Sequence, residues 1–188
     1  NASSLLALVS ILGLAVSLAV KDSLSNLAGG LTILGTKPFK VGDYVQIDDI
    51  EGTVQDIGLV YTSLTTWDNR RILVPNSTVV DAEVTNYTTE PLRRVDLTIT
   101  ASYGASVEEV KEVIQGVLTR HDKVLKDPAP FARLSSYGDN ALGYAVRAWC
   151  RTEDYWDVYY DLLEELKSAF DAAGLSIPYP QMEVTLRK

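Results

Sequence analysis

Residues able to carry out chemistry are few and far apart in this sequence of 188 residues, which holds one histidine and one cysteine. His121 lies in the charged run Arg120–Lys123 after a helical pattern, so we expect a solvated surface histidine rather than a general base. Cys150 follows Trp149 in an alternating pattern, which predicts a small packed side chain. A single cysteine also excludes a disulfide framework and a cysteine-based zinc site.

Motifs that would indicate an enzyme or a ligand site are missing or incomplete. The sequence has no G-x-S-x-G nucleophile elbow, and the pair Gly29-Gly30 is not followed by the Lys-Ser/Thr of a phosphate-binding loop. The acidic residues Asp48, Asp49 and Glu51 lack the ligand spacing of an EF-hand, so we interpret them as a solvated hairpin turn. We therefore expect no enzymatic activity, no catalytic residues, no bound metal and no cofactor.

Composition narrows the classes of protein further. The chain carries 17 Lys and Arg against 25 Asp and Glu, a net charge of -8, which argues against a nucleic-acid partner. A hydrophobic content of 46% and a charged content of 22% exclude bulk disorder. Because the first residue is Asn1 and not Met, we expect a piece of a longer protein.

The N-terminal 20 residues contain no charged residue. As a helix they would span about 30 Å, the thickness of a bilayer core. Many small residues are interspersed, which permits close approach of membrane helices. A signal peptide would have positive residues before the apolar run, and a buried soluble helix would need a larger core. The pattern therefore favours a transmembrane helix that packs against other helices.

A second uncharged stretch covers residues 23–36. Asp22 and Ser23 are both good N-caps, so we predict a break near residues 21–23 and a fresh helix that ends at Lys37 and Pro38. This second helix carries an apolar stripe suited to the membrane interface, made of Leu24, Leu27, Leu31 and Leu34.

From residue 39 the hydrophobic period becomes that of short strands. β-branched runs up to residue 74, with turn residues at 48–52 and 68–69, predict a small all-β module.

Beyond residue 92 strands and helices alternate. We predict strands at 95–100, 131–137 and 142–151, and a possible last strand at 181–187. One helix begins at Ser106 with Glu109 completing a capping box; another begins at Asp154 and ends at Gly174. The apolar face of the last helix includes Val158, Leu162, Leu163, Leu166 and Phe170. The order β-α-β-β-α is a ferredoxin-like plan.

Four segments in order carry a resemblance to a known family. They are residues 13–19 followed by 23–30, the entry into the β module at 37–45, the short motifs at 52–54 and 74–76, and the long run 170–181. In these segments the chain resembles the small-conductance mechanosensitive channels of bacterial membranes, and the resemblance covers nearly the full length.

The resemblance implies a fold that combines a membrane α part with an α+β part, assembled as a homo-heptamer. Residues 1–37 would form a kinked pore-lining transmembrane helix, and 38–91 a small Sm-like β domain. Residues 92–177 would form a ferredoxin-like α/β domain, and 178–188 one strand of a heptameric β-barrel. Further transmembrane helices would precede Asn1, giving a multi-pass protein of the cell (inner) membrane whose residues after about 37 lie in the cytoplasm.

Leu14 and Leu18 match the two leucine rings that close the pore in this family. They are four residues apart and share one helix face, so seven copies of each would form two apolar collars that exclude water. Spacing alone favours ordinary lipid-facing or packing leucines, and the resemblance favours the gate. It also assigns helix packing to Ala7, Ser10, Gly13 and Ser17. It places the kink at Lys21, Asp22 and Ser23, with Asp22 where the family commonly has glycine.

The implied function is a mechanosensitive ion channel, opened by membrane tension, that releases ions and small osmolytes on hypo-osmotic shock. Its partners would be further copies of itself, membrane lipids and the permeating solutes. The alternative is a membrane-anchored oligomeric scaffold or regulatory cage without tension-gated conduction.

Overall fold

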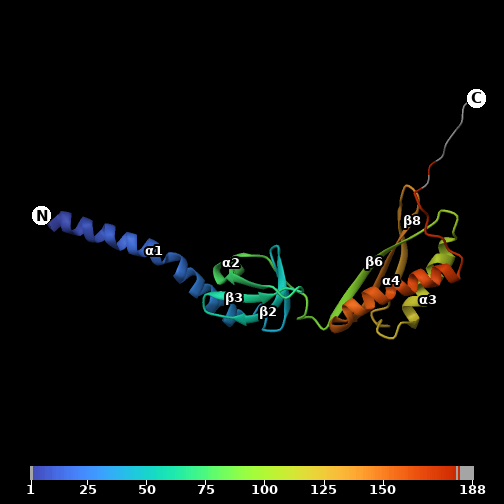
Figure 1. Cartoon of the computed structure of the whole chain (residues 1–188), viewed down its shortest axis with the longest axis horizontal. Coiled ribbons are helices and arrows are strands. Elements are labelled where there is room, and N and C mark those ends of the chain that lie inside the picture. Colours follow the sequence, from blue (N-terminus) through green and yellow to red (C-terminus); the bar gives the residue numbers. More distant parts are fainter. Residues whose placement is uncertain (1, 181, 183–188) are drawn as a thin grey trace, which may run out of the picture. The chain divides into compact units, whose positions relative to one another are not determined.

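The chain forms two compact units in a computed structural model that describes residues 2–180 and 182 (Figure 1). The first unit extends to Thr89 and holds one long helix and a β domain. The second begins at Glu90 and holds an α/β domain. Each unit has its own buried apolar core.

Helix α1 (Ala2–Thr36) is continuous, so the predicted break at residues 21–23 was wrong. Lys, Asp and Ser each cost only a few tenths of a kcal/mol, up to about 0.7, in a helix interior, and neither Pro nor Gly occupies these positions. The helix ends where predicted. The Lys37 N–H donates to the Ile33 carbonyl at 2.8 Å, and Lys37 itself takes a φ of 51° before Pro38.

The β domain contains β1 (Tyr44–Ile47), β2 (Ile50–Ile57), β3 (Tyr61–Thr65), β4 (Arg71–Pro75), α2 (Asn76–Asp81) and β5 (Val84–Asn86). Its five-stranded antiparallel sheet has the order β4-β3-β2-β1-β5. Positive φ at Asp48 and Asn69 confirms turns at 48–49 and 68–69, but residues 50–52 of the predicted turn belong to β2 and pair with β1. Neither α2 nor β5 was predicted, because elements of six and three residues are too short for a periodic signal in the sequence. The apolar core of the β domain consists of Ile33 from α1 together with Phe39, Val45, Ile47, Val54, Leu64, Val74 and Val79.

The α/β domain contains β6 (Leu92–Ala101), α3 (Val107–Arg120), β7 (Phe131–Tyr137), β8 (Leu142–Arg151), the short 3-10 helix η1 (Thr152–Asp154) and α4 (Tyr155–Ala172). Its sheet has the order β6-β8-β7, with β8 antiparallel to both neighbours. A strand inserted between two strands that a helix connects is the split β-α-β arrangement, which confirms the ferredoxin-like plan. The strand predicted at 178–188 falls mostly outside the described residues. Within it, 178–180 and Met182 are not in a strand.

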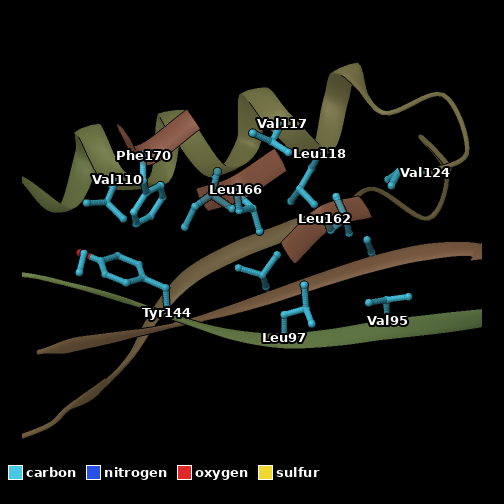
Figure 2. Close-up of a cluster of buried hydrophobic side chains, with 14 of the residues drawn as sticks. Val95, Leu97, Val110, Val117, Leu118, Val124, Tyr144, Leu162, Leu166 and Phe170 are labelled. Atoms are coloured by element: carbon cyan, nitrogen blue, oxygen red, sulfur yellow. The ribbon is translucent and has the colours of Figure 1, made fainter. Parts of the chain in front are cut away.

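Both helices cover the same face of this sheet (Figure 2). The apolar core between them holds Val95, Leu97 and Tyr144 from the sheet, and Val110, Ile114, Val117, Leu118, Leu162, Leu166 and Phe170 from the helices. Leu163 was predicted on this face but is 38% exposed, since it follows Leu162 by about 100° around the helix. The capping box was also wrong: Ser106 is the N-cap of α3, but its side chain makes no capping hydrogen bond. Gly174, with a φ of 70°, ends α4 as predicted.

His121 is buried, which corrects the prediction of a solvated histidine. It is the C-cap of α3, and only 3% of its side chain is exposed. Its Nδ1 accepts the Lys123 N–H at 3.2 Å, and its Nε2 lies 3.5 Å from Asp161 Oδ2 on α4. The chain turns back beneath the end of α3, with Val124 buried in the core, and this turn encloses the imidazole. Cys150 is fully buried, as predicted.

Candidate functional site: helix α1 and its junction with the β domain

Helix α1 presents a long apolar surface that the described chain does not cover. The segment Leu6–Thr36, 31 residues long, is the one helix in the described part of the chain whose length and composition suit a membrane span. None of its most apolar stretch is buried. Each exposed Å² of such surface costs about 25 cal/mol in water, so this helix requires lipid or other protein around it.

The two predicted gate residues lie on this uncovered surface. Leu14 is 72% exposed and Leu18 is 71% exposed, one turn apart on the same helix face. The predicted packing residues Ala7, Ser10, Gly13 and Ser17 are also exposed. A Cβ added to Gly13 would meet nothing within 4 Å. Contacts for all six positions would have to come from other molecules, so their roles stay predictions.

Lys21, Asp22 and Ser23 are exposed on the continuous helix. The Asp22 carbonyl accepts a hydrogen bond from Asn26 Nδ2 at 2.9 Å, one turn further on.

The face of α1 that packs on the β domain is not the predicted apolar stripe. Its leucine stripe, Leu24, Leu27, Leu31 and Leu34, stays between 36% and 60% exposed. The covered residues are instead Gly29, Gly30 and Ile33, which are buried, and Asn26, which is partly buried. A stripe rule that counts large apolar residues misses this face, because two of its four members are glycines and one is polar. The spacing 26, 29, 30, 33 was the available signal.

Gly29 and Gly30 bring the α1 backbone directly against the β domain. A Cβ built on Gly29 would lie 2.8 Å from the carbonyl carbon and oxygen of Asn76. A Cβ on Gly30 would lie 2.7 Å from Asn76 Nδ2 and also overlap the Leu59 carbonyl oxygen. These distances are shorter than ordinary van der Waals contact, so only glycine permits this approach.

Asn26 ties α1 to the start of α2. Its Oδ1 accepts the Ser77 backbone N–H at 3.0 Å and the Ser77 hydroxyl at 2.8 Å. The N-cap residue of α2, Pro75, supplies no side-chain hydrogen bond. The first N–H groups of a helix lack intrahelical partners, and here a side chain from another helix satisfies one of them.

Asn76 holds the other side of the junction rigid. It is fully buried; its Oδ1 accepts the Thr62 hydroxyl at 2.8 Å, and its Nδ2 donates to the Gly58 carbonyl at 2.8 Å. Its backbone N–H donates to the Val60 carbonyl at 2.9 Å. These bonds fix the corner between β4 and α2 to residues 58–60. Gly29 lies against this corner, and Gly30 lies against both the corner and Leu59.

Asp43 anchors the segment that follows α1. Its Oδ2 accepts the Lys40 N–H at 2.9 Å and the Asn86 amide at 2.8 Å. Partial burial acts to raise the pKa of Asp43, but the hydrogen bonds from Asn86, Lys40, Thr88 and Thr89 outweigh it and hold the pKa below its usual value. The ionised carboxylate therefore joins the chain after α1 to β5.

The junction makes the second half of α1 part of the β domain, while the first half has no partner within the described chain. A displacement of the first half must therefore bend the helix or strain the junction. The described residues include no group of three or more His, Cys, Asp or Glu side chains placed to hold a metal ion. Fold and site together define a membrane protein whose apolar helix is attached to a β domain followed by an α/β domain.

Comparison with known proteins gives this class a family. Residues 22–89 match the β-domain of mechanosensitive ion channels, and residues 95–177 match the C-terminal region of the MscS mechanosensitive ion channel. The small-conductance mechanosensitive channel of Edwardsiella ictaluri is 38% identical over 174 residues, which cover 93% of this chain and 61% of that protein.

A solved structure agrees over the whole chain. The closed-state crystal structure of Helicobacter pylori MscS superposes with a TM-score of 0.95 at 30% identity, covering 100% of this chain and 75% of that one. The chain belongs to the MscS family of mechanosensitive ion channels. Members of this family are oligomeric membrane proteins and not enzymes. The chain spans less than two thirds of the length of several curated relatives, 61% to 66%.

Proposed function

We propose that the whole protein is an ion channel opened by membrane tension, through which ions and small osmolytes leave the cell on hypo-osmotic shock. The observation that carries the proposal is α1: a membrane-length helix, uncovered in the single chain and fixed to a folded domain at one end. Membership of the MscS family supports it. In the proposed assembly, seven copies of α1 surround one pore in the cell (inner) membrane. Residues after about 37 lie in the cytoplasm, and further transmembrane helices precede this segment.

The closed pore is sealed by Leu14 and Leu18. Both side chains are more than two-thirds exposed in the single chain and point the same way from the helix. Seven copies would bring them together as two stacked apolar rings. A narrow apolar constriction excludes water and therefore ions. The small residues at 7, 10, 13 and 17 would allow neighbouring helices to approach closely enough to narrow the pore.

Opening follows from the area that each state occupies in the membrane. Tension favours the conformation with the larger footprint, in which the α1 helices tilt apart, the leucine rings separate and the pore fills with water. The junction at Asn26, Gly29 and Gly30 makes the β domain follow the lower half of α1. Where this motion exceeds what the helix can absorb by bending, the two hydrogen bonds that Ser77 donates to Asn26 Oδ1 are the weakest polar link of the junction.

The test is a patch recording of the full-length protein in liposomes under stepwise suction. We expect discrete current steps above a reproducible tension. Leu18→Ser should lower that tension, because hydroxyl groups in the constriction favour the water-filled state. Leu12→Ser, the same substitution on the opposite side of α1, is the matched control and should change the threshold less.

Two outcomes would contradict the proposal in different ways. An unchanged threshold in Leu18→Ser would remove the gate assignment but leave the channel. Silence up to membrane rupture, from protein shown to be folded and oligomeric, would instead favour a membrane-anchored scaffold or regulatory cage.

A further inference from the structure

Three aromatic side chains form a row on the β-domain sheet, on the face that points away from the core. Tyr44 of β1 is in the middle: its ring centroid lies 5.0 Å from that of Trp67, just after β3, and 5.7 Å from that of Tyr87, just after β5. The neighbouring Val45 is fully buried in the core, so Tyr44 lies on the opposite face of the strand. Trp67 is 73% exposed. The aromatic row therefore presents a large ring to solvent.

Polar contacts hold the aromatic row in place. The Tyr44 hydroxyl donates a hydrogen bond to Glu51 Oε2 at 2.8 Å. Burial is the largest cause that raises the pKa of Tyr44 to about 12; the bond to Glu51 raises it further, and a hydrogen bond from Trp67 lowers it. The hydroxyl thus stays protonated, and it keeps the indole ring of Trp67 and the carboxylate of Glu51 close to each other.

Negative charge beside the aromatic row has no cationic partner in the described part of the chain. The β1–β2 hairpin carries Asp48, Asp49 and Glu51, and none of the three forms an ion pair with a described residue. Among the described residues, no Arg or Lys lies over the ring of Tyr44 or Trp67 either. The face of an aromatic ring carries partial negative charge, so rings and carboxylates here favour the same kind of ligand, a cation.

A second aromatic cluster, on α4, already has its cations. Trp156 packs edge-to-face on Tyr155 with ring centroids 5.1 Å apart, and Arg93 lies over the Tyr155 ring at 3.6 Å. The nearby Asp157 is paired with Lys123 at 2.7 Å. The α/β domain therefore satisfies its own rings and acids, whereas the β domain leaves a similar combination open to a ligand.

The chemistry of the aromatic row selects one kind of cation. A guanidinium group brings five N–H donors and a Lys ammonium brings three, and each donor needs an acceptor. The Tyr44 hydroxyl is already engaged, which leaves the carboxylate of Glu51. The hairpin acids are not grouped in a way that could hold a metal ion. A quaternary ammonium has no N–H to satisfy and is attracted by ring faces, best of all by that of Trp.

We propose that Trp67, Tyr44 and Glu51 bind the quaternary ammonium group of a small organic solute. The exposed ring of Trp67 receives the methylated nitrogen, and Glu51 supplies the opposite charge beside it. A row of rings contacts the ligand on one side only, so binding is weak and only a solute at high concentration occupies the site. The proposal goes beyond the proposed channel, and it can be tested without measuring conduction.

Saturation-transfer NMR of the full-length protein in an uncharged detergent detects such weak binding, with tetramethylammonium as the probe. We expect transfer from the protein to the methyl groups of the probe, and much less to tert-butanol, which is uncharged and of similar size. Trp67→Phe keeps a ring and should retain most of the affinity. Trp67→Leu keeps an apolar side chain without a ring and should lower the affinity about two- to fivefold.

Two further variants test the charge and the position of the site. Glu51→Gln should lower the affinity about twofold at low salt, and high salt should reduce this difference because it screens exposed charges. Trp156→Leu makes the same substitution in the α4 cluster and should leave the affinity unchanged. Trp67 and Glu51 are both exposed, so their variants should fold, which thermal unfolding in the same detergent checks.

Three results would overturn the proposal. Equal affinity in Trp67→Leu and Trp67→Phe would mean an ordinary apolar contact. A loss of affinity in Trp156→Leu in place of the Trp67 variants would move the site to α4. No transfer to the probe from folded wild-type protein would mean that the aromatic row is covered in the whole protein. Patch recording is a separate readout: a protein that binds the probe but stays silent under tension would contradict the proposed channel alone.

Discussion

The two halves of α1 belong to one uninterrupted helix but have opposite relations to the rest of the chain. The first half, up to about residue 20, touches nothing else in the described chain, and its large apolar side chains from Leu6 onward are exposed. The second half places Ile33 in the β-domain core and hydrogen-bonds to α2 through Asn26. One half is therefore specified by contacts outside the chain and the other by contacts within it.

The two halves of α1 therefore contain small residues for different physical reasons. A side chain at Gly13 would meet open space in the single chain, so its small size matters only when other helices are present. A side chain at Gly29 or Gly30 would overlap the backbone of the β domain in the single chain already. Small residues in the first half of α1 thus matter for contacts with other helices, whereas Gly29 and Gly30 in the second half matter for the folding of the single chain.

The largest expected effect comes from emptying the buried end of this junction. Ile33 is 2% exposed in the β-domain core, so Ile33→Ala should reduce the stability of the β domain by about 2–5 kcal/mol. Leu31→Ala, at a position 60% exposed, should change it by less than about 0.5 kcal/mol. Hydrogen exchange read on peptides from residues 44–86 measures both, and peptides from the α/β domain serve as an internal reference. Equal protection in the two variants would mean that the second half of α1 is not part of the β domain.

A smaller effect is expected where the backbones approach. Gly30→Ala should cost about 1–3 kcal/mol, because the added methyl group forces α1 away from Asn76 and Leu59. Gly13→Ala should leave the single chain unharmed, and alanine favours the helix by about 1 kcal/mol over glycine. Thermal unfolding of the two variants in detergent provides the comparison. Similar losses in both would contradict the distinction between folding glycines and assembly glycines.

The sequence predicted the elements with long, regular patterns. The strands at 131–137 and 142–151 have the predicted bounds, and the helices that end near His121 and Gly174 follow clear apolar periodicity. Local charge patterns were less informative. His121 sits among charged neighbours and is nevertheless buried, because the turn at residues 121–124 folds back over it and Asp161 of α4, forty residues on, lies 3.5 Å from its Nε2. The break at Asp22 failed for a related reason: N-cap preference describes where a helix begins, and is too weak to interrupt one already formed.

The candidate site could be predicted from the sequence only in part, because its residues act through contacts with other chains or with distant parts of this chain. Leu14 and Leu18 could be assigned through family resemblance, and a single chain supplies no contact that tests them. The junction could not be found by counting apolar residues, since Asn26, Gly29 and Gly30 bury little apolar area. Their importance lies in what they approach, and Asn76 and Ser77 are about fifty residues away in the sequence.

The smallest expected effect concerns the polar tie between α1 and α2. Asn26→Ala removes the acceptor for the Ser77 N–H and hydroxyl, and because this site is only partly buried, water can replace part of the loss. We expect a cost of about 1 kcal/mol, seen as faster amide exchange at the start of α2, with Ser25→Ala as the exposed control. A contact this weak can break and re-form while Ile33 stays in its core, so it is suited to a joint that moves. A cost as large as that of Ile33→Ala would show instead that α1 and the β domain move only as one rigid body.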